Sequence, residues 1–221
     1  MKKVVISVGG SLVIPNKVDL EFLKRLKKVI KKFSRYKIVI VTGGGALARQ
    51  YISSLKDKGE KIKSLVGIQT TKLNAMLVSN FLGANLLIPN SLNEIGRLLK
   101  QKNLVVCGAL GYHPDMTSDG TAANIARYVK ADYLINMTNV RGLYSADPRK
   151  VKNAKFISEI SFKEFMKKVN KIKFKAGQHF VLDQSAARII NRHKIKTAIL
   201  KDVDNLEKVL KDERFNGTTI S

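Results

Sequence analysis

The sequence predicts an α/β protein with a largely parallel sheet that helices cover on both faces. Two observations support this prediction. Short apolar runs alternate with longer stretches in which hydrophobic residues recur at helical spacing. The apolar runs also lack the polar–apolar alternation of a half-exposed strand, which indicates strands buried on both sides. A length of 221 residues suffices for one such domain, in which we expect two lobes that meet near residue 115.

The first half of the chain alternates strands and helices. Apolar runs predict strands at residues 3–8, 38–41, 84–88 and 104–107. Helical spacing predicts helices at residues 20–33, 46–56, 65–82 and 92–99. In the first of these helices, Leu23, Leu26 and Ile30 fall on one face. Strands separated by helices in this way are typical of a parallel sheet.

The second half continues the pattern with shorter elements. Helices are expected at residues 119–130, 162–169, 183–193 and 206–210. Strands are expected at residues 133–137, 156–157, 195–200 and 217–220, the last of them at an edge of the sheet. Polar, glycine-containing loops occupy residues 108–118 and 138–148. Both follow strands, and ligands bind at the carboxyl ends of strands in open α/β sheets.

The composition is that of a globular protein with a strongly basic surface. Hydrophobic residues make up 44% of the chain and charged residues 26%, which is ordinary for a soluble domain. The 41 Lys and Arg outnumber the 17 Asp and Glu, and the net charge of +24 attracts anionic substrates and polyanions. The lysines are spread along amphipathic helices, so we expect solvated helix faces and no specific nucleic-acid binding.

Other protein classes are not indicated. No apolar run reaches 18 residues, which argues against a membrane span, and the N-terminus enters a strand without a secretory signal. Cys107 is the only cysteine and falls in an apolar run, so we expect a core residue in a cytoplasmic protein. There is no zinc-ligand spacing, and we assign no residue as a metal ligand.

The triple glycine at residues 43–45 is the first candidate site. It lies between a predicted buried strand and a predicted helix, and glycines there allow a sharp turn and a close approach of other groups. The helix that follows offers free N–H groups and a positive dipole end, which suit an anion such as phosphate. A glycine-rich turn that binds nothing remains the alternative. The pattern matches neither of the common glycine-rich nucleotide fingerprints.

Four loops follow strands of the predicted sheet, at residues 9–11, 43–45, 108–118 and 138–148. In a parallel sheet, all of them can open on one edge. Two would bring backbone N–H groups, and a third brings the hydroxyls of Thr117 and Ser118 beside Asp119. This combination suits one phosphorylated ligand, or two placed end to end.

Motifs in these loops resemble those of the amino acid kinase family. They are Val-Gly-Gly-Ser at 8–11, Thr-Gly-Gly-Gly at 42–45, Thr-Ser-Asp at 117–119 and Thr-Asn-Val-Arg-Gly-Leu-Tyr-Ser-Ala-Asp-Pro at 138–148. The last is close to the family pattern T-N-V-D-G-V-Y-T-A-D-P. Further residues are similar to the archaeal type of uridylate kinase within that family, at 67–68, 74–77, 175–177, 183–187 and 217–220. The resemblance runs almost end to end.

The resemblance implies a three-layer αβα sandwich in one domain over residues 1–221. Its N-terminal lobe, about 1–115, would hold UMP, and its C-terminal lobe, about 116–221, would hold ATP. The implied activity is that of a UMP kinase, in which the γ-phosphoryl of ATP passes to UMP, giving UDP and ADP for pyrimidine nucleotide synthesis, with Mg²⁺ as cofactor. A homo-oligomer, a hexamer formed as a trimer of dimers, is also implied.

The resemblance also implies roles for individual residues. ATP would be held by Gly10, Ser11, Gly45, Arg49, Thr138, Tyr144 and Asp147. UMP would be held by Gly44, Ser64, Tyr112, His113, Pro114, Asp115, Met116, Thr117 and Ser118. Catalytic roles fall on Asp119, which organises cationic groups around the transferred phosphoryl, on Arg49, and on Asp183 near the phosphates.

Several of these residues have a structural alternative. Asp119 and Asp183 each begin a predicted helix and could be N-caps. Arg49 could be a solvated residue of the first helical turns. Asp147 precedes a proline and could simply start a turn, and Tyr144 could pack in the core.

Three positions depart from the family pattern. Ser7 stands where many members carry a lysine, Ser64 where an acidic residue contacts the nucleoside, and Arg141 where the ATP loop usually has Asp. They leave two alternatives open: another small-molecule kinase of the family, acting on isopentenyl phosphate or a carboxylate, and a non-catalytic nucleotide- or RNA-binding relative. Residues 46–49 lack the histidine expected after the triple glycine in isopentenyl phosphate kinases.

Overall fold

The computed structural model describes residues 1–114, 116–146, 148, 151–170 and 182–221. Its strands are β1 (Lys3–Val8), β2 (Lys37–Thr42), β3 (Leu104–Cys107), β4 (Tyr133–Met137), β5 (Leu143–Tyr144), β6 (Phe156–Ile157), β7 (Glu159–Ile160), β8 (Thr197–Leu200) and β9 (Gly217–Ile220). Seven of them form one sheet in the order β3-β2-β1-β4-β8-β9-β7. Adjacent strands in this sheet are parallel to each other, except for β8 and β9, which are antiparallel. The prediction of a largely parallel sheet is confirmed.

Helices connect most of these strands. They are α1 (Gly10–Val13), α2 (Leu20–Lys32), α3 (Gly45–Ser53), α4 (Glu60–Leu82), α5 (Leu92–Gln101), α6 (Ser118–Val129), α7 (Phe162–Asn170), α8 (Gln184–His193) and α9 (Val203–Leu210). In the described part of the chain, no helix is long and apolar enough to cross a membrane.

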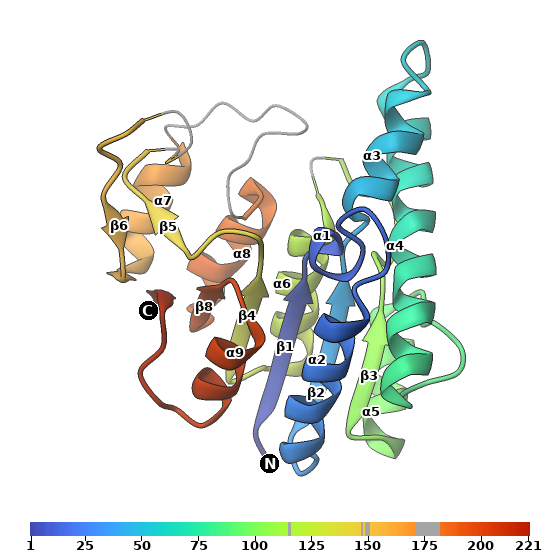
Figure 1. The fold of residues 1–221 in the computed structure, drawn as a ribbon, viewed down its shortest axis with the longest axis horizontal. Helices are drawn as coiled ribbons and strands as arrows, with labels where there is room; N and C mark the ends of the chain where they lie inside the picture. The colour runs from blue at the N-terminus through green and yellow to red at the C-terminus, as the bar shows by residue number, and fades with distance from the viewer. Residues whose placement is uncertain (115, 147, 149–150, 171–181) are drawn as a thin grey trace.

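The sheet is the middle layer of three, as the resemblance implies (Figure 1). One hydrophobic cluster joins its strands to α5, α6, α7 and α8, and a second joins them to α2, α4 and α9. Successive side chains of a strand point to opposite faces, so Val5 belongs to the first cluster while Val4 and Ile6 belong to the second. Burial on both sides explains why the strands read as continuous apolar runs.

Two sequence predictions about strands are wrong. Residues 84–88 form no strand, because Asn85 bonds to β3 through its side chain and not through its backbone. Its Nδ2 donates to the Val106 carbonyl, and its Oδ1 accepts from the Val106 N–H. Leu86 and Leu87 are consequently exposed. The strand at residues 217–220 exists, but it lies between β8 and β7 and not at an edge, because the short β7 pairs with its outer side.

The register brings the strand ends level. Val8 at the end of β1 lies opposite Thr42 of β2 and Met137 of β4. The segments that follow these three strands therefore meet at one edge of the sheet. This edge lies at the top of Figure 1.

Candidate active site

Two glycine turns pack backbone against backbone at this edge. The Gly43 N–H donates to the Val8 carbonyl at 2.9 Å. A Cβ on Gly10 would lie 2.7 Å from the carbonyl carbon of Gly43, with no flexible side chain to move aside. Gly45 has φ of +64° in the left-handed region, and a Cβ there would lie 2.9 Å from the Ser11 nitrogen. The glycines are therefore required by close contact and by backbone conformation.

Helix α3 begins in this pair of turns without a side-chain cap. Its N-cap is Gly44, and α1 and α4 likewise begin at a glycine, whereas α2, α5, α6, α8 and α9 each have a side-chain oxygen that accepts a first-turn N–H. The first N–H groups of a helix have no partner within it and carry the positive end of its dipole. This is the arrangement that anion binding at a helix end requires.

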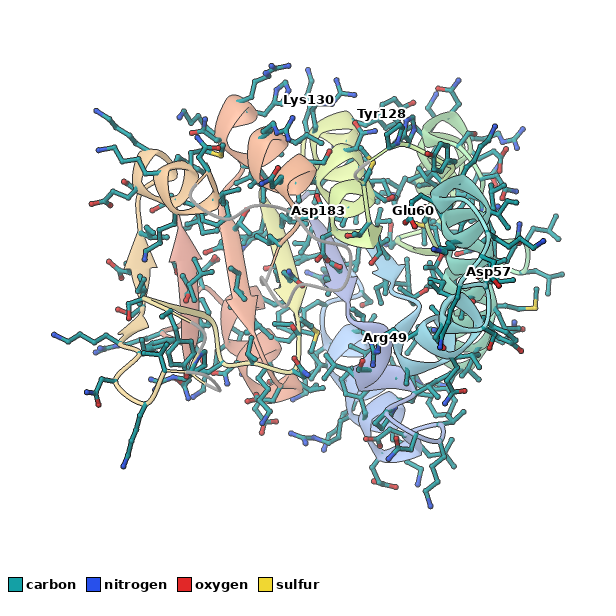
Figure 2. The ribbon with its side chains drawn as sticks, turned by 90° about the horizontal axis from the view of Figure 1, so that it is seen from above. Arg49, Asp57, Glu60, Tyr128, Lys130 and Asp183 are labelled. Carbon is teal, nitrogen blue, oxygen red and sulfur yellow. The ribbon has the colours of Figure 1, made fainter. Side chains whose placement is uncertain are left out.

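A guanidinium and a hydroxyl border the same turns from two other directions. The Nη2 of Arg49 on α3 donates to the Ser11 hydroxyl at 3.4 Å. The Ser118 hydroxyl at the start of α6 lies 3.4 Å from the place a Cβ on Gly43 would take. Figure 2 looks down on this edge of the sheet, with Arg49 and Asp183 on opposite sides of the end of β1. The sequence motifs at 9–11, 43–45 and 117–119 thus converge.

Asp119 lies over the end of β1. Its Oδ1 accepts a hydrogen bond from the buried Ser7 hydroxyl at 2.8 Å. The capping side chain of α6 is Thr117, whose Oγ1 accepts from the Asp119 N–H at 3.2 Å. The alternative that Asp119 caps its helix is therefore wrong, and its carboxylate is turned toward the sheet.

Asp183 is buried, and its carboxylate bonds to the first turns of both α8 and α6. Its Oδ1 accepts from the Ala186 N–H at 2.6 Å, which makes it the N-cap of α8 and confirms that alternative. Its Oδ2 accepts from the Thr117 and Gly120 N–H groups at 3.1 and 2.9 Å and from the Thr117 hydroxyl at 2.5 Å. A carboxylate engaged in this way is suited to fixing the start of α6, and with it Asp119.

The environment raises the pKa of Asp119 from 3.8 to about 7. The largest cause is burial, because protein surrounds the carboxyl group on most sides and disfavours its charged form. The carboxylate of Asp183 raises the pKa further, and the Ser7 hydrogen bond opposes both. A cation placed beside Asp119 would return it to the ionised form.

The residues implied for UMP border the turns from the other side. Gly44 lies beside α4, since a Cβ on it would be 3.7 Å from the Gly67 carbonyl oxygen. Ser64 lies one turn before Gly67 on α4 and is half-buried.

The remaining residues that the resemblance implies for UMP precede α6 or begin it. Tyr112 and Met116 are half-buried, whereas His113 and Pro114 are exposed. Asp115 lies outside the described residues.

The residues implied for adenosine are spread more widely. Thr138 follows β4, and its N–H donates to the Leu200 carbonyl of β8 at 2.9 Å. It lies beside the first glycine turn, since a Cβ on Gly9 would be 3.8 Å from its Cα. Tyr144 lies apart, on the β5–β6 hairpin, where its ring meets Phe156 edge-on at 5.5 Å. Asp147 lies outside the described residues.

Arg141, the charge reversal in this loop, is held by the hairpin. Its guanidinium lies 3.9 Å from the centre of the Phe156 ring, and its Nε donates to the Asn216 side chain. Stacking on an aromatic ring accommodates a positive charge at this position.

The sequence did not reveal two contacts of this site. One is the pairing of Ser7 with Asp119. The other is Asn74 of α4, which donates to the carbonyls of the triple-glycine turn. A signal for the second exists, because the segment at residues 74–77, which resembles archaeal uridylate kinases, begins with Asn74.

A three-layer αβα sandwich with glycine turns, an uncapped helix and an aspartate at one edge of its sheet is suited to an enzyme that handles phosphate groups. The family model that matches the chain is "Amino acid kinase family", over residues 2–201. The chain belongs to this family.

Within the family, the chain is similar to archaeal uridylate kinases. It is 38% identical to the uridylate kinase of Pyrococcus abyssi over 225 residues, covering 99% of each chain. It is 39% identical to that of Archaeoglobus fulgidus over 224 residues, covering 99% of this chain and 100% of the relative. The crystal structure of the A. fulgidus uridylate kinase superposes with a TM-score of 0.87 over 100% of both chains.

Proposed function

We propose that this protein is a UMP kinase, which transfers the γ-phosphoryl group of ATP to UMP and releases UDP and ADP. It would supply UDP for the synthesis of UTP and CTP. The observation that carries the proposal is the uncapped start of α3 between two packed glycine turns, with Asp119 and Arg49 beside it. Full-length similarity to uridylate kinases of two archaea supports the choice of acceptor.

The reaction requires little covalent help from the protein. An oxygen of the UMP phosphate forms a bond to the γ-phosphorus of ATP, the bond from that phosphorus to the β–γ bridging oxygen breaks, and ADP leaves with the electron pair. A phosphate monoester has its second pKa near ~6, so the acceptor is already anionic and no general base is needed. Catalysis then rests on alignment and on neutralising the charge of the moving group.

The residues of the proposed site fit these two tasks. The N–H groups at the start of α3 and the Arg49 guanidinium would hold ATP phosphates, together with Gly10 and Ser11. Thr138, Tyr144 and Asp147 would hold the adenosine of ATP, in a C-terminal lobe of about residues 116–221.

The N-terminal lobe, about residues 1–115, would hold UMP. Gly44, Ser64 and the loop 112–118 are the residues we propose for it. Asp119 would orient cationic groups around the transferred phosphoryl, and Asp183 would position Asp119 through the first turn of α6.

Mg²⁺ fits this site as an ion carried by ATP. Among the described residues, no group of three or more His, Cys, Asp or Glu could hold a metal alone. Mg²⁺ commonly binds substrate phosphates and one or two carboxylates, and keeps several waters. Asp119 is the carboxylate that would face it, and the ion would supply positive charge to the phosphate oxygens.

We also propose a cytoplasmic homo-oligomer, a hexamer built from dimers. Apolar side chains of α4 are exposed on the outer side of the helix, at Ile62, Leu65, Leu73 and Met76. An apolar stripe of this kind in a strongly charged protein suits contact with a second copy.

An acceptor panel tests the function. ADP release would be followed with Mg·ATP and, separately, UMP, CMP, dUMP, AMP and isopentenyl phosphate. We expect UMP to have the highest kcat/KM. A higher kcat/KM for isopentenyl phosphate, or ATP binding without turnover of any acceptor, would contradict the proposal.

A further inference from the structure

We propose that Asn74 is a positioning residue, which aims the N–H groups of the triple-glycine turn at the phosphates. The inference rests on the proposed function and adds to it a residue outside the loops. Asn74 lies in the middle of α4 and is 1% exposed. Its Nδ2 donates to the Gly43 carbonyl at 2.8 Å and to the Gly44 carbonyl at 3.3 Å.

Peptide geometry converts these two bonds into a direction for the turn. In a planar trans peptide, the C=O of one residue points opposite to the N–H of the next. Because Asn74 draws the Gly43 and Gly44 carbonyls toward α4, the N–H groups of Gly44 and Gly45 point away from α4. The Gly45 nitrogen lies against Gly10, so its N–H faces the first glycine turn, whereas the Gly43 carbonyl packs against Gly10 as well as bonding to Asn74.

The bonding of Asn74 is not the arrangement that serves stability alone. The two carbonyls can only accept, so the amide must present its nitrogen to them. Its Oδ1 is buried and has no hydrogen-bond partner within the described part of the chain. A buried acceptor without a partner costs free energy. A leucine here would remove that cost but would leave the buried Gly43 carbonyl without its donor, so the exchange brings little net stability in either direction. Holding the turn accounts for an asparagine at this place.

A second side chain of α4 fastens the acceptor loop in the same way. The Thr71 hydroxyl accepts from the Ala109 N–H at 2.8 Å, and the Thr42 hydroxyl donates to the Thr71 carbonyl at 2.8 Å. A Cβ on Gly108 would lie 2.6 Å from the Thr71 hydroxyl, so the loop starts directly against the helix. One stretch of α4 thus sets the phosphate turn relative to the acceptor loop.

Two substitutions separate positioning from stability. Asn74→Asp keeps the shape of the side chain but removes the donor, and Asn74→Leu removes both the donor and the unpartnered oxygen. The matched control is Asn85→Asp. Asn85 is also buried, at 3% exposure, and it also bonds to backbone, but its partners are Val106 and Leu87, away from the glycine turns.

We expect both Asn74 variants to lower kcat/KM for UMP and ATP by about 100-fold, as small misplacements of reacting groups do. Asn74→Leu exchanges one unpartnered buried oxygen, its own Oδ1, for another, the Gly43 carbonyl, so its melting temperature should stay within a few degrees of the wild type. Asn85→Asp should lower the melting temperature and leave kcat/KM within about twofold, because it touches no group that binds phosphate. An Asn74→Leu protein with wild-type kcat/KM would overturn the inference.

A binding measurement separates this inference from the proposed function. Glycine-selective ¹⁵N labelling gives one amide signal for each of the 15 glycines. Added inorganic tripolyphosphate should shift the signals of Gly44 and Gly45 in the wild type and leave them unmoved in Asn74→Leu. If the wild type fails to turn over UMP but shows this difference, the acceptor is wrong and the role of Asn74 stands. Equal shifts in both proteins would refute that role.

Discussion

The glycine turns and the carboxylates meet at the same edge of the sheet but are built in opposite ways. The turns use backbone alone, and their geometry is fixed by contacts that leave no room for a Cβ. They carry no titratable group, so their N–H groups are donors at every pH. Asp119 and Asp183 act through side chains, and the pKa of Asp119 lies near neutrality.

The difference separates geometry from charge in this site. In the proposed function, the turns would determine where a phosphate chain can lie, and their contribution would be set when the protein folds. The ionisation of Asp119 depends on pH, on Asp183 and on any cation that arrives. Substitutions in the turns should therefore act on every substrate and at every pH, whereas those in the carboxylates should act through charge.

Gly10→Ala should have the largest effect. Its Cβ would meet backbone atoms of Gly43 and Gly45 that cannot move separately from β2 and α3. We expect activity to fall at least about 1,000-fold and stability to fall by about 3 kcal/mol, as in overpacked sites. Gly59→Ala is the control, because a Cβ there meets nothing within 4 Å. Kinetics and chemical denaturation of both variants give the measurement, and an active Gly10→Ala enzyme would contradict the packing argument.

Asp119→Asn should come next, and it should change the pH profile. In the wild type, kcat/KM should rise with pH through about 7, because Asp119 orients cations only when ionised. The variant should lose about 100-fold at pH 8 and show no such rise. Steady-state rates from pH 5.5 to 9 give the test. A rise of unchanged midpoint in the variant would assign the titration to another group.

Arg49→Met should have a smaller effect confined to ATP. Arg49 is exposed and donates a long hydrogen bond of 3.4 Å to the Ser11 hydroxyl, so the fold should be unaffected. Loss of the guanidinium that would contact the ATP phosphates should raise the KM for ATP about tenfold, with little change in the KM for UMP. Arg97→Met, on an exposed position of α5, controls for the change in net charge. Equal effects of the two substitutions would make Arg49 a solvated surface residue.

The sequence was sufficient to predict most of the fold, for a physical reason. Burial on both faces of the sheet leaves apolar runs, and burial on one face leaves helical periodicity, so both kinds of element are visible in a single chain. The strand expected at 84–88 was wrong, because Leu86 and Leu87 are exposed and the Asn85 side chain takes the place of backbone hydrogen bonds to β3. The spacing of apolar residues does not show where a polar side chain makes the hydrogen bonds that a strand backbone would otherwise make.

The site could be predicted only in part. Glycines between a strand and a helix are a local signal, and the convergence of three motifs follows from a parallel sheet. Contacts between distant side chains leave no such signal. Ser7 and Asp119 are 112 residues apart in sequence, and Asn74 reaches the glycine turn from 31 residues away. Neither pairing can be derived from spacing, because both depend on how the helices are placed over the sheet.

The smallest expected effect is on the stability of the substrate-free protein, and it tests whether the ionisation of Asp119 responds to pH. Between about pH 4 and pH 7, the folded protein keeps on Asp119 a proton that the unfolded chain has released. The wild type should therefore lose stability as pH rises through this range, and Asp119→Asn should not.

At pH 8 the variant should be more stable by about 1–3 kcal/mol, and at pH 4 the two proteins should be alike. Ser7→Ala sharpens the test, because the Ser7 hydrogen bond lowers the pKa of Asp119, and its removal should move the midpoint of the wild-type loss upward. Urea denaturation of the substrate-free protein at several pH values measures both shifts. If the difference in free energy of unfolding between wild type and Asp119→Asn does not change with pH, the pKa of Asp119 is not raised in the folded protein. The glycine turns and the carboxylates would then differ in how they are built but not in their response to pH.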